Sequence, residues 1–367
     1  MSELYTVSAS PHITKPHHTT SGIMLDVLIA LSPCVIAAIL YFGYHVAVNL
    51  AVCLIGCVGS ELLFNLIRSG KWNRDGVKQS SIFDLSAAVT AVILTLNLPA
   101  KIRMESWDLN VYFKGAEHTV DNIAFSFDTV ILCLMASVFS VVIVKMMFGG
   151  IGKNFANPAA MGRIFLFAFA PLAAVQTIGL VADATTGATW LSGDKVTNIR
   201  HLFLRMILGN TGSAAVGETC VIAILIGYAY LSLRRVIDWR VPLIIVGSAA
   251  VFALLFDGLL TMHLSGGRLM NNMFGHVLSG GLIFGAVFMA TDYSTSPNTF
   301  RGSVVFAVGI ALITMLIRVF AGYPEGMSFA IVIMNIASPL IDKFIVPKPF
   351  GYTREKKARI KKTEGEQ

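Results

Sequence analysis

The sequence predicts an all-α integral membrane protein with about ten transmembrane helices, arranged as a five-plus-five inverted repeat. Hydrophobic residues make up 55% of the 367 positions, only 13% are charged, and the mean hydropathy is +0.71. A water-soluble fold cannot hide so much apolar surface behind so few charges, so the lipid bilayer is the expected solvent. Apolar runs of roughly 17 to 25 residues, long enough to cross a hydrocarbon core as a helix, recur along the chain.

The chain divides into five predicted parts. The polar amino-terminal segment, 1–22, lacks the features of a signal peptide, so the first apolar run is expected to stay in place. A polar loop (179–216) separates a first membrane half (23–178) from a second (217–345), and a basic tail (346–367) follows. The apolar runs of the first half are 23–44, 46–67, 82–98, 130–148 and 164–178. Those of the second half are 217–233, 241–260, 273–289, 304–319 and 327–345.

The placement of Lys and Arg orients these helices. With a cytoplasmic amino terminus, and with Arg163 counted in the loop before the fifth run, the cytoplasmic segments hold 19 basic residues and the outer segments hold 7. Such an excess is typical of cytoplasmic loops. Both termini are therefore expected in the cytoplasm, and the loop 179–216 on the outer side of the membrane. Topology and anionic lipids explain the net charge of +7, and no nucleic acid partner is expected.

The inverted repeat follows from five spans in each half, because an odd number reverses the direction of the second half. Weak internal similarity supports it: Asn157-Pro158 leads into the fifth run, and the tenth run contains Asn335 and Ser338-Pro339. The same layout suits a secondary transporter or channel, which is an alternative function.

The outer loop carries a strip of small and polar residues, 184–189, that ends at Thr189. No neighbouring base would activate Thr189 as a nucleophile, so no catalytic residue is expected in this strip. The strip is accessible to a large partner, and the sequence favours Thr189 as a target of modification.

The richest cytoplasmic loop is the glycine-rich stretch 149–158, which contains Asn154 and Asn157. Glycines permit close backbone approach, and two amides supply paired donors and acceptors that suit the edge of a heteroaromatic ring such as a flavin. The alternative is a tight turn in which Asn157 caps a helix that begins at Pro158. Spacing alone does not separate the two interpretations.

Other motifs exclude some chemistries. Residues 212–219 nearly match a phosphate-binding loop, but Glu218 stands where a lysine is required, so nucleotide hydrolysis is excluded. Cys53 and Cys57 lie one helical turn apart and could point at one metal or cluster. Packing as small apolar residues is the favoured interpretation of this pair, and no metal site is predicted.

Ionisable residues within the apolar runs are costly in lipid and mark candidate functional positions. Of these, Glu61, Asp84 and Asp257 are the best candidates to line an ion path. The full set is Asp26, Glu61, Asp84, Lys145, Asp257, His276, Arg318 and Asp342.

Three stretches carry a resemblance to a known family: GGIGKNFANPAAMGR at 149–163, DATTGAT at 183–189, and 291–297 followed by 323–326 and 329–330. The chain resembles the family that joins the D subunit of the Rnf electron-transport complex and the B subunit of the sodium-translocating NADH:quinone reductase. The resemblance covers roughly residues 23–348. It implies a membrane-embedded electron carrier within an ion-translocating ferredoxin:NAD⁺ oxidoreductase, without turnover of its own.

The resemblance also implies a covalent cofactor. Members carry FMN, joined through its phosphate to the last residue of an Asp-x-x-Ser/Thr-Gly-Ala-Thr motif by a flavin transferase that acts outside the cytoplasm. Here that residue is Thr189, and the recognition strip is formed by Asp183, Thr186, Gly187 and Ala188. Thr186 stands where serine is commoner, and it keeps the hydroxyl.

A second flavin and a set of partners are implied in the same way. The quinone-reductase relative holds a riboflavin near the asparagines that correspond to Asn154 and Asn157. The partners within an Rnf complex would be the A, B, C, E and G subunits, which carry iron–sulfur and further flavin centres. The short segment before residue 23 favours the Rnf branch over the quinone-reductase branch. A protein with a purely structural role in assembly is a third alternative, and the outer insertion around Trp107 (99–129) is unusual for either branch.

Overall fold

A computed structural model of the chain describes residues 19–70, 81–98, 103–104, 127–169, 173–174, 215–260, 266–321 and 326–346. These residues are helical except for two short strands, β1 (Arg103–Met104) and β2 (Ala173–Ala174), and the connecting turns. The strands pair antiparallel, with Arg103 opposite Ala174. The predicted all-α class is confirmed.

The first two helices follow their apolar runs closely. Thr19 caps the first helix by accepting a hydrogen bond from the Gly22 amide, and Gly43 separates it from the second. The elements are α1 (Thr20–Phe42), α2 (Tyr44–Ser69), the 3₁₀ turn η1 (Ser81–Asp84), α4 (Ser86–Asn97), α5 (Phe127–Val138), the π-helix η4 (Phe139–Met146) and α6 (Pro158–Phe169).

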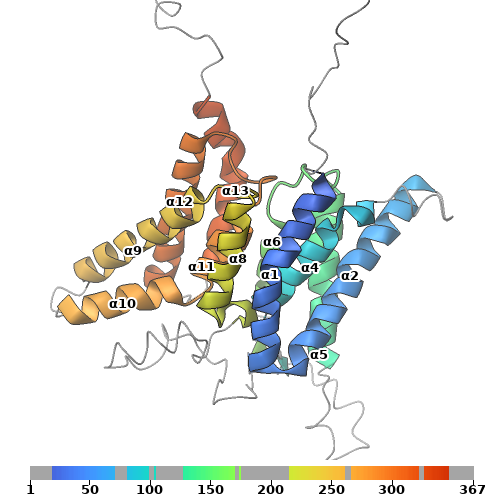
Figure 1. The fold of residues 1–367 in the computed structure, drawn as a ribbon, viewed down its shortest axis with the longest axis horizontal. Helices are drawn as coiled ribbons and strands as arrows, with labels where there is room; N and C mark the ends of the chain where they lie inside the picture. The colour runs from blue at the N-terminus through green and yellow to red at the C-terminus, as the bar shows by residue number, and fades with distance from the viewer. Residues whose placement is uncertain are drawn as a thin grey trace, which may run out of the picture.

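The second half follows the gap in the description at 175–214. Its elements are η5 (Val216–Glu218), α8 (Val221–Leu233), α9 (Arg240–Leu260), α10 (Gly266–Leu278), α11 (Leu282–Phe284), the π-helix η6 (Gly285–Met289), α12 (Phe300–Phe320) and α13 (Met327–Phe344). Figure 1 shows α2, α4 and α5 together on one side and α9, α10 and α12 on the other. The halves meet where α1 packs on α8 and α6 packs on α13.

Among the residues that the structure describes, six helices are long and apolar enough to cross a membrane, and a seventh span results if Asn272–Leu278 and Leu282–Met289 count as one span bent by 49°. The chain is a multi-pass membrane protein. The number ten is not reached among the described residues, because three of the predicted runs form apolar helices of only 10–17 residues: Ser86–Asn97, Pro158–Ala168 and Val221–Leu233.

Some details of the sequence prediction were wrong. The fifth helix begins at Pro158 rather than at Ile164, because Asn157 caps it and a proline fits the first helical position. Arg163 therefore lies inside α6, where it is buried, and not in a cytoplasmic loop. The third and eighth runs are also interrupted, at Leu85 and at Gly280-Gly281, where the backbone is left-handed.

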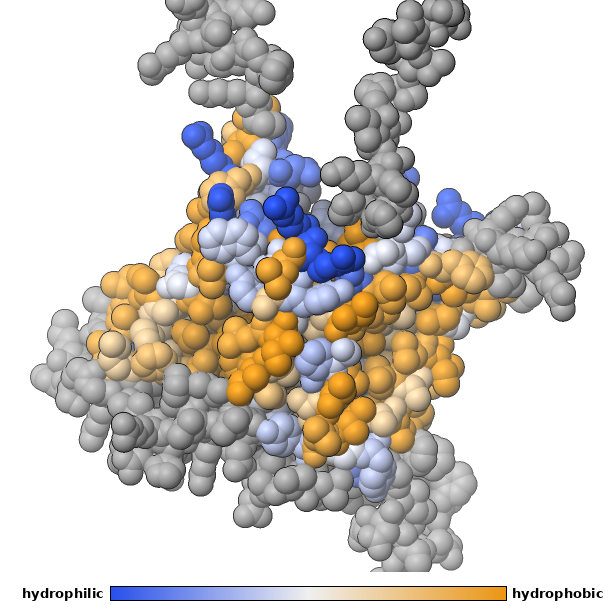
Figure 2. Space-filling model, in the orientation of Figure 1, coloured by the Kyte–Doolittle hydropathy of each residue, from blue (hydrophilic) through white to orange (hydrophobic). Residues whose placement is uncertain are grey.

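Large apolar side chains cover the outer surface of the helices. Leu40 is 67% exposed and Ile55 is 71% exposed, which would be costly in water and is favourable against lipid. Figure 2 shows apolar residues as a broad band on the visible face, with hydrophilic residues gathered at its upper edge. The band is consistent with a bilayer around the helices.

Candidate functional site

A cavity of about 90 Å³ lies where the two halves meet. Its walls come from α1, α4, η4, the loop before α6, the start of α6, α8, η6 and the loop after η6. The polar lining residues are Ser86, Thr90, Lys145, Asn154, Asn157, Thr291, Asp292, Tyr293 and Ser294. The main apolar ones are Met24, Val27, Val89, Ile93, Leu231, Val287 and Phe288.

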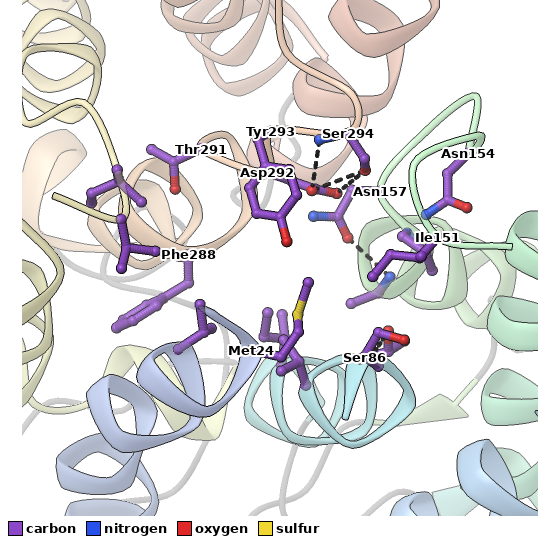
Figure 3. Close-up of a pocket in the computed structure, with 18 of the residues that line it drawn as sticks. Met24, Ser86, Ile151, Asn154, Asn157, Phe288, Thr291, Asp292, Tyr293 and Ser294 are labelled. Atoms are coloured by element: carbon purple, nitrogen blue, oxygen red, sulfur yellow. Dashed lines mark hydrogen bonds between the residues drawn. The ribbon is translucent and has the colours of Figure 1, made fainter. Parts of the chain in front are cut away.

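The glycine-rich loop forms one rim of this cavity. Gly149, Gly150 and Gly152 have φ values of 115°, 89° and 81°, a region that residues with side chains rarely adopt. These turns bring Ile151 and Asn154 to the cavity. Figure 3 shows Asn154 and Asn157 on one side of the opening, with Met24 and Ser86 across from them.

Asn157 has the capping role that was one of the two interpretations of its position before Pro158. Its Oδ1 accepts hydrogen bonds from the amides of Ala159 (3.0 Å) and Ala160 (3.2 Å), so it caps α6. Its Nδ2 donates to the Met289 carbonyl at 3.1 Å and ties the first half to η6. Both ends of the amide therefore have partners within the chain, although the side chain lines the cavity.

Asn154 differs from Asn157. Its Oδ1 is buried and accepts no hydrogen bond from the part of the chain that the structure describes. A buried amide oxygen without a donor is unfavourable, so a ligand with an N–H group at this position would stabilise the site. The two asparagines, which spacing could not distinguish, are thus one helix cap and one open acceptor.

The loop after η6 contributes a half-buried acidic group, Asp292. Both carboxylate oxygens of Asp292 accept from the Ser294 hydroxyl at 2.9 Å, and Oδ1 also accepts from the Ser294 amide at 3.1 Å. Burial raises the pKa of the Asp292 carboxyl, and the hydrogen bonds from Ser294 oppose that rise. Burial, together with the charge of Asp292, raises the pKa of Tyr293 to about 12, so its phenol stays protonated and can donate.

A buried ion pair lies beside the cavity. Lys145 Nζ donates to Glu61 Oε2 at 2.7 Å and to Ser86 Oγ at 2.7 Å. Lys145 is 1% exposed and Glu61 is 0% exposed. The other oxygen of Glu61 accepts from the Ser81 hydroxyl. Of the candidate ion-path residues, Glu61 is therefore paired, and Asp84 lies nearby in η1, half-buried.

The third ion-path candidate, Asp257, lies in the other half. Its Oδ2 is 3.6 Å from Nε2 of His276, a residue of α10. Arg318 of α12 donates to the carbonyl oxygens of His276, Ser279 (3.0 Å) and Gly280 (2.7 Å). The structure does not bring Asp257 together with Glu61 and Asp84.

Sequence reasoning missed one buried polar network. Arg163 Nη1 donates to Asn97 Oδ1 at 3.0 Å and lies 3.4 Å from Glu218 Oε1. Glu218, whose charge excluded nucleotide hydrolysis, thus has a structural partner. The signal available in the sequence was the apolar stretch 164–169 that follows Arg163 directly, which favours a buried position for that residue.

The predicted attachment site lies outside the described residues. Thr189, Asp183, Thr186, Gly187 and Ala188 all fall in the gap at 175–214. Cys53 and Cys57 are both buried in the main apolar core, to which both halves contribute. Among the described residues, no group of three or more His, Cys, Asp or Glu side chains could hold a metal ion.

The lining of the cavity has the chemistry that suits a planar heteroaromatic ligand. Apolar side chains such as Phe288 and Val287 suit a hydrocarbon edge, and the polar groups of Asn154, Lys145 and Tyr293 suit an edge of ring nitrogens and carbonyls. The open acceptor of Asn154 fits the ring N–H of a flavin pyrimidine.

Comparison with known proteins gives a consistent family. The family model described as "NQR2, RnfD, RnfE family" matches residues 6–109 and 126–351. The unmatched stretch, 110–125, falls within the predicted outer insertion around Trp107.

Several relatives align over nearly the whole chain. The D subunit of the Na(+)-translocating ferredoxin:NAD(+) oxidoreductase complex of Acetobacterium woodii is 36% identical over 97% of this chain and 99% of its own length. The D subunit of the proton-translocating ferredoxin:NAD(+) oxidoreductase complex of Clostridium ljungdahlii is 31% identical over 96% and 97%. The B subunit of the Na(+)-translocating NADH-quinone reductase of Chromohalobacter salexigens is 40% identical, but over 57% of this chain and 52% of its own length.

Proposed function

The chain belongs to the NQR2, RnfD, RnfE family, and we propose that it is the membrane-embedded, flavin-carrying D subunit of an ion-translocating ferredoxin:NAD⁺ oxidoreductase complex. The observation that carries this proposal is the end-to-end similarity to two such D subunits. The similarity to the B subunit of a quinone reductase covers about half of each chain, and this difference favours the ferredoxin-linked complex. The protein would transfer electrons within the complex and have no activity alone.

FMN is proposed to be joined by a phosphoester to Thr189. The support is the Asp183–Thr189 motif, which places an aspartate, a hydroxyl residue and Gly-Ala-Thr at the spacing that a flavin transferase recognises in this family. The distribution of Lys and Arg supports an outer location for this loop, on the side where the transferase acts.

A second flavin, a riboflavin, is proposed to bind in the cavity. The support is the mixed lining and the open Oδ1 of Asn154. Asn154 would accept from the ring N–H, Tyr293 would donate, and Phe288 would contact the hydrocarbon edge. When bound, the flavin would supply one- and two-electron chemistry near the cytoplasmic face.

The topology of ten spans in two inverted halves is also proposed. The third and eighth spans are both interrupted at left-handed residues, Leu85 and Gly280-Gly281. Glu61 is the eighteenth residue of α2 counted from Tyr44, and Asp257 is the eighteenth residue of α9 counted from Arg240. Equal positions of acidic residues in the second and seventh spans support the repeat.

Several further parts of the proposal rest on chemistry and resemblance. The partners would be the A, B, C, E and G subunits and the flavin transferase, with anionic lipids at the basic cytoplasmic loops and tail. Glu61, Asp84 and Asp257 remain candidates to line an ion path. The relatives are described as translocating Na⁺ in one case and protons in the other, so either ion is compatible with this chain.

The experiment that tests this proposal is intact-mass analysis of the chain expressed with a flavin transferase. We expect an added mass equal to FMN less one water, lost in Thr189→Ala and kept in the matched control Thr185→Ala. An unmodified chain that moves a solute would instead favour the transporter alternative.

A further inference from the structure

Lys145 is a buried cation at the wall of the cavity. Its Nζ donates to Ser86 Oγ, and both residues line the cavity. The other titratable groups of the lining are Asp292 and Tyr293. The Asp292 carboxylate is already held by Ser294, and the Tyr293 phenol is neutral, so Lys145 is the positive charge that the described lining offers to a ligand.

Glu61 lies behind Lys145 as its counterion. It contacts Lys145 through Oε2, while its Oε1 accepts from Ser81, whose hydroxyl in turn accepts from Asn65 at 3.1 Å. These contacts hold the carboxylate on α2. The charge felt in the cavity is therefore the charge of an ammonium partly offset by a neighbouring carboxylate.

The second half has a matching cation with a different role. Lys145 is the nineteenth residue of the fourth span counted from Phe127, and Arg318 is the nineteenth of α12 counted from Phe300. Each donates at the interruption of a neighbouring span. Arg318 satisfies three backbone carbonyls there, which is a structural task.

The hydrogen bonds of Lys145 go instead to two side chains, Glu61 and Ser86. Lys145 therefore differs from Arg318, because it does not hydrogen-bond to the backbone carbonyls at the interruption of the neighbouring span. The Lys145 ammonium pairs with the Glu61 carboxylate, so no backbone carbonyl would lose a hydrogen bond if the ammonium turned toward a ligand. A cation in that situation is suited to interact with a ligand in the cavity.

We propose that Lys145 supplies the positive charge that stabilises a reduced flavin in the cavity, and that Glu61 sets how much of this charge the flavin feels. This inference rests on the second-flavin part of the proposed function. When two electrons and one proton are added to a flavin, one negative charge remains on its pyrimidine ring. An ammonium close to that ring favours reduction, and a carboxylate behind the ammonium opposes it.

The test is a spectroelectrochemical titration of the full-length chain in a Thr189→Ala background, which removes the proposed covalent FMN so that the signal reports the proposed cavity flavin. Dithionite supplies the electrons through mediator dyes. Lys145→Gln is expected to shift the reduction equilibrium at least about tenfold toward the oxidised flavin. Glu61→Gln is expected to shift it by a similar factor in the opposite direction, and Lys145→Arg to leave it near the wild-type value. A tenfold change is about 30 mV for two electrons.

Opposite shifts are the signature of an electrostatic role, because a merely structural ion pair would move both variants in one direction. Equal-sign shifts, or no shift in either variant, overturn the proposal. If a single variant does not fold, the double variant Glu61→Gln/Lys145→Gln keeps a neutral pair and is expected between the two single variants. A Thr189→Ala chain without any flavin overturns both the second-flavin site and the role of Lys145, whereas covalent FMN on Thr189 is decided separately by intact mass.

Discussion

The Asn157 side chain donates a hydrogen bond to the Met289 carbonyl at 3.1 Å, joining the start of α6 to the end of η6 across 132 positions of sequence. The same side chain caps α6 through its oxygen. One residue thus fixes the rim of the cavity from both halves, while Asn154, three residues earlier, keeps an open acceptor.

The two asparagines are predicted to respond differently to substitution. Asn157→Ala removes a helix cap and the link to Met289, so it should lower the free energy of unfolding by about 0.5–2 kcal/mol. Asn154→Ala should leave thermal stability nearly unchanged and reduce the amount of non-covalent flavin that copurifies. Thermal unfolding in detergent and flavin extraction measure the two effects. Loss of stability in Asn154→Ala with none in Asn157→Ala would reverse the assignment.

The buried pair of Lys145 and Glu61 predicts strong coupling. Removing either partner leaves an uncompensated buried charge, so Lys145→Gln or Glu61→Gln should each cost about 3–5 kcal/mol of stability. The double variant should cost much less than the sum of the single variants. A double-mutant cycle of unfolding measures this coupling, and additive losses would show that the two charges do not depend on each other.

Asp292 predicts a pH-dependent stability. Because burial raises its pKa above the unfolded value of about 4, its favourable contribution is present below that pH and is lost as pH rises through the folded pKa. Asp292→Asn removes the titration, so the stability of this variant relative to the wild type should increase as pH rises above about 4. Ser294→Ala removes hydrogen bonds to the carboxylate and should move the same window to higher pH. A constant difference between wild type and Asp292→Asn contradicts the assigned pKa direction.

Gly281 lies where the structure leaves no room for a larger side chain. It has a φ of +70°, and a Cβ there would overlap the Glu218 carboxylate at Oε1. Gly281→Ala should therefore lower stability by at least about 1–3 kcal/mol. The control Gly59→Ala adds a Cβ that meets no atom within 4 Å inside α2, and it should be neutral or stabilising by about 0.5–1 kcal/mol. Comparable melting temperatures for the two variants would exclude the predicted contact.

Apolar runs were sufficient to predict the helical class and the long spans α1, α2, α9, α12 and α13. Hydropathy could not predict where helices are broken. Gly280-Gly281 is a local signal for a left-handed backbone, whereas the left-handed conformation of Leu85 has no such signal in the sequence. The sequence also offered the correct start of the fifth helix, at Pro158, since Asn157-Pro158 is a cap followed by a residue suited to the first helical turn.

Only part of the candidate site could be predicted, because contacts between distant residues are not visible in the sequence. Buried ionisable residues can be recognised from an apolar context, as for Lys145 and Glu61, but their pairing across 84 positions cannot. Arg163 and Glu218 were placed in other roles because local sequence does not reveal a partner from another helix. Asn154 and Asn157 were identified from the motif, and only the hydrogen bonds separate the cap from the open acceptor.

Electron transfer through FMN on Thr189 is tested most directly by ferredoxin-dependent NAD⁺ reduction in the purified complex. Wild type, Thr189→Ala and the control Thr185→Ala should be compared at equal content of this chain. We predict that Thr189→Ala falls to the background rate while Thr185→Ala keeps the wild-type rate. An unchanged rate in Thr189→Ala, with the complex fully assembled, would contradict the account and indicate a purely structural role for this protein.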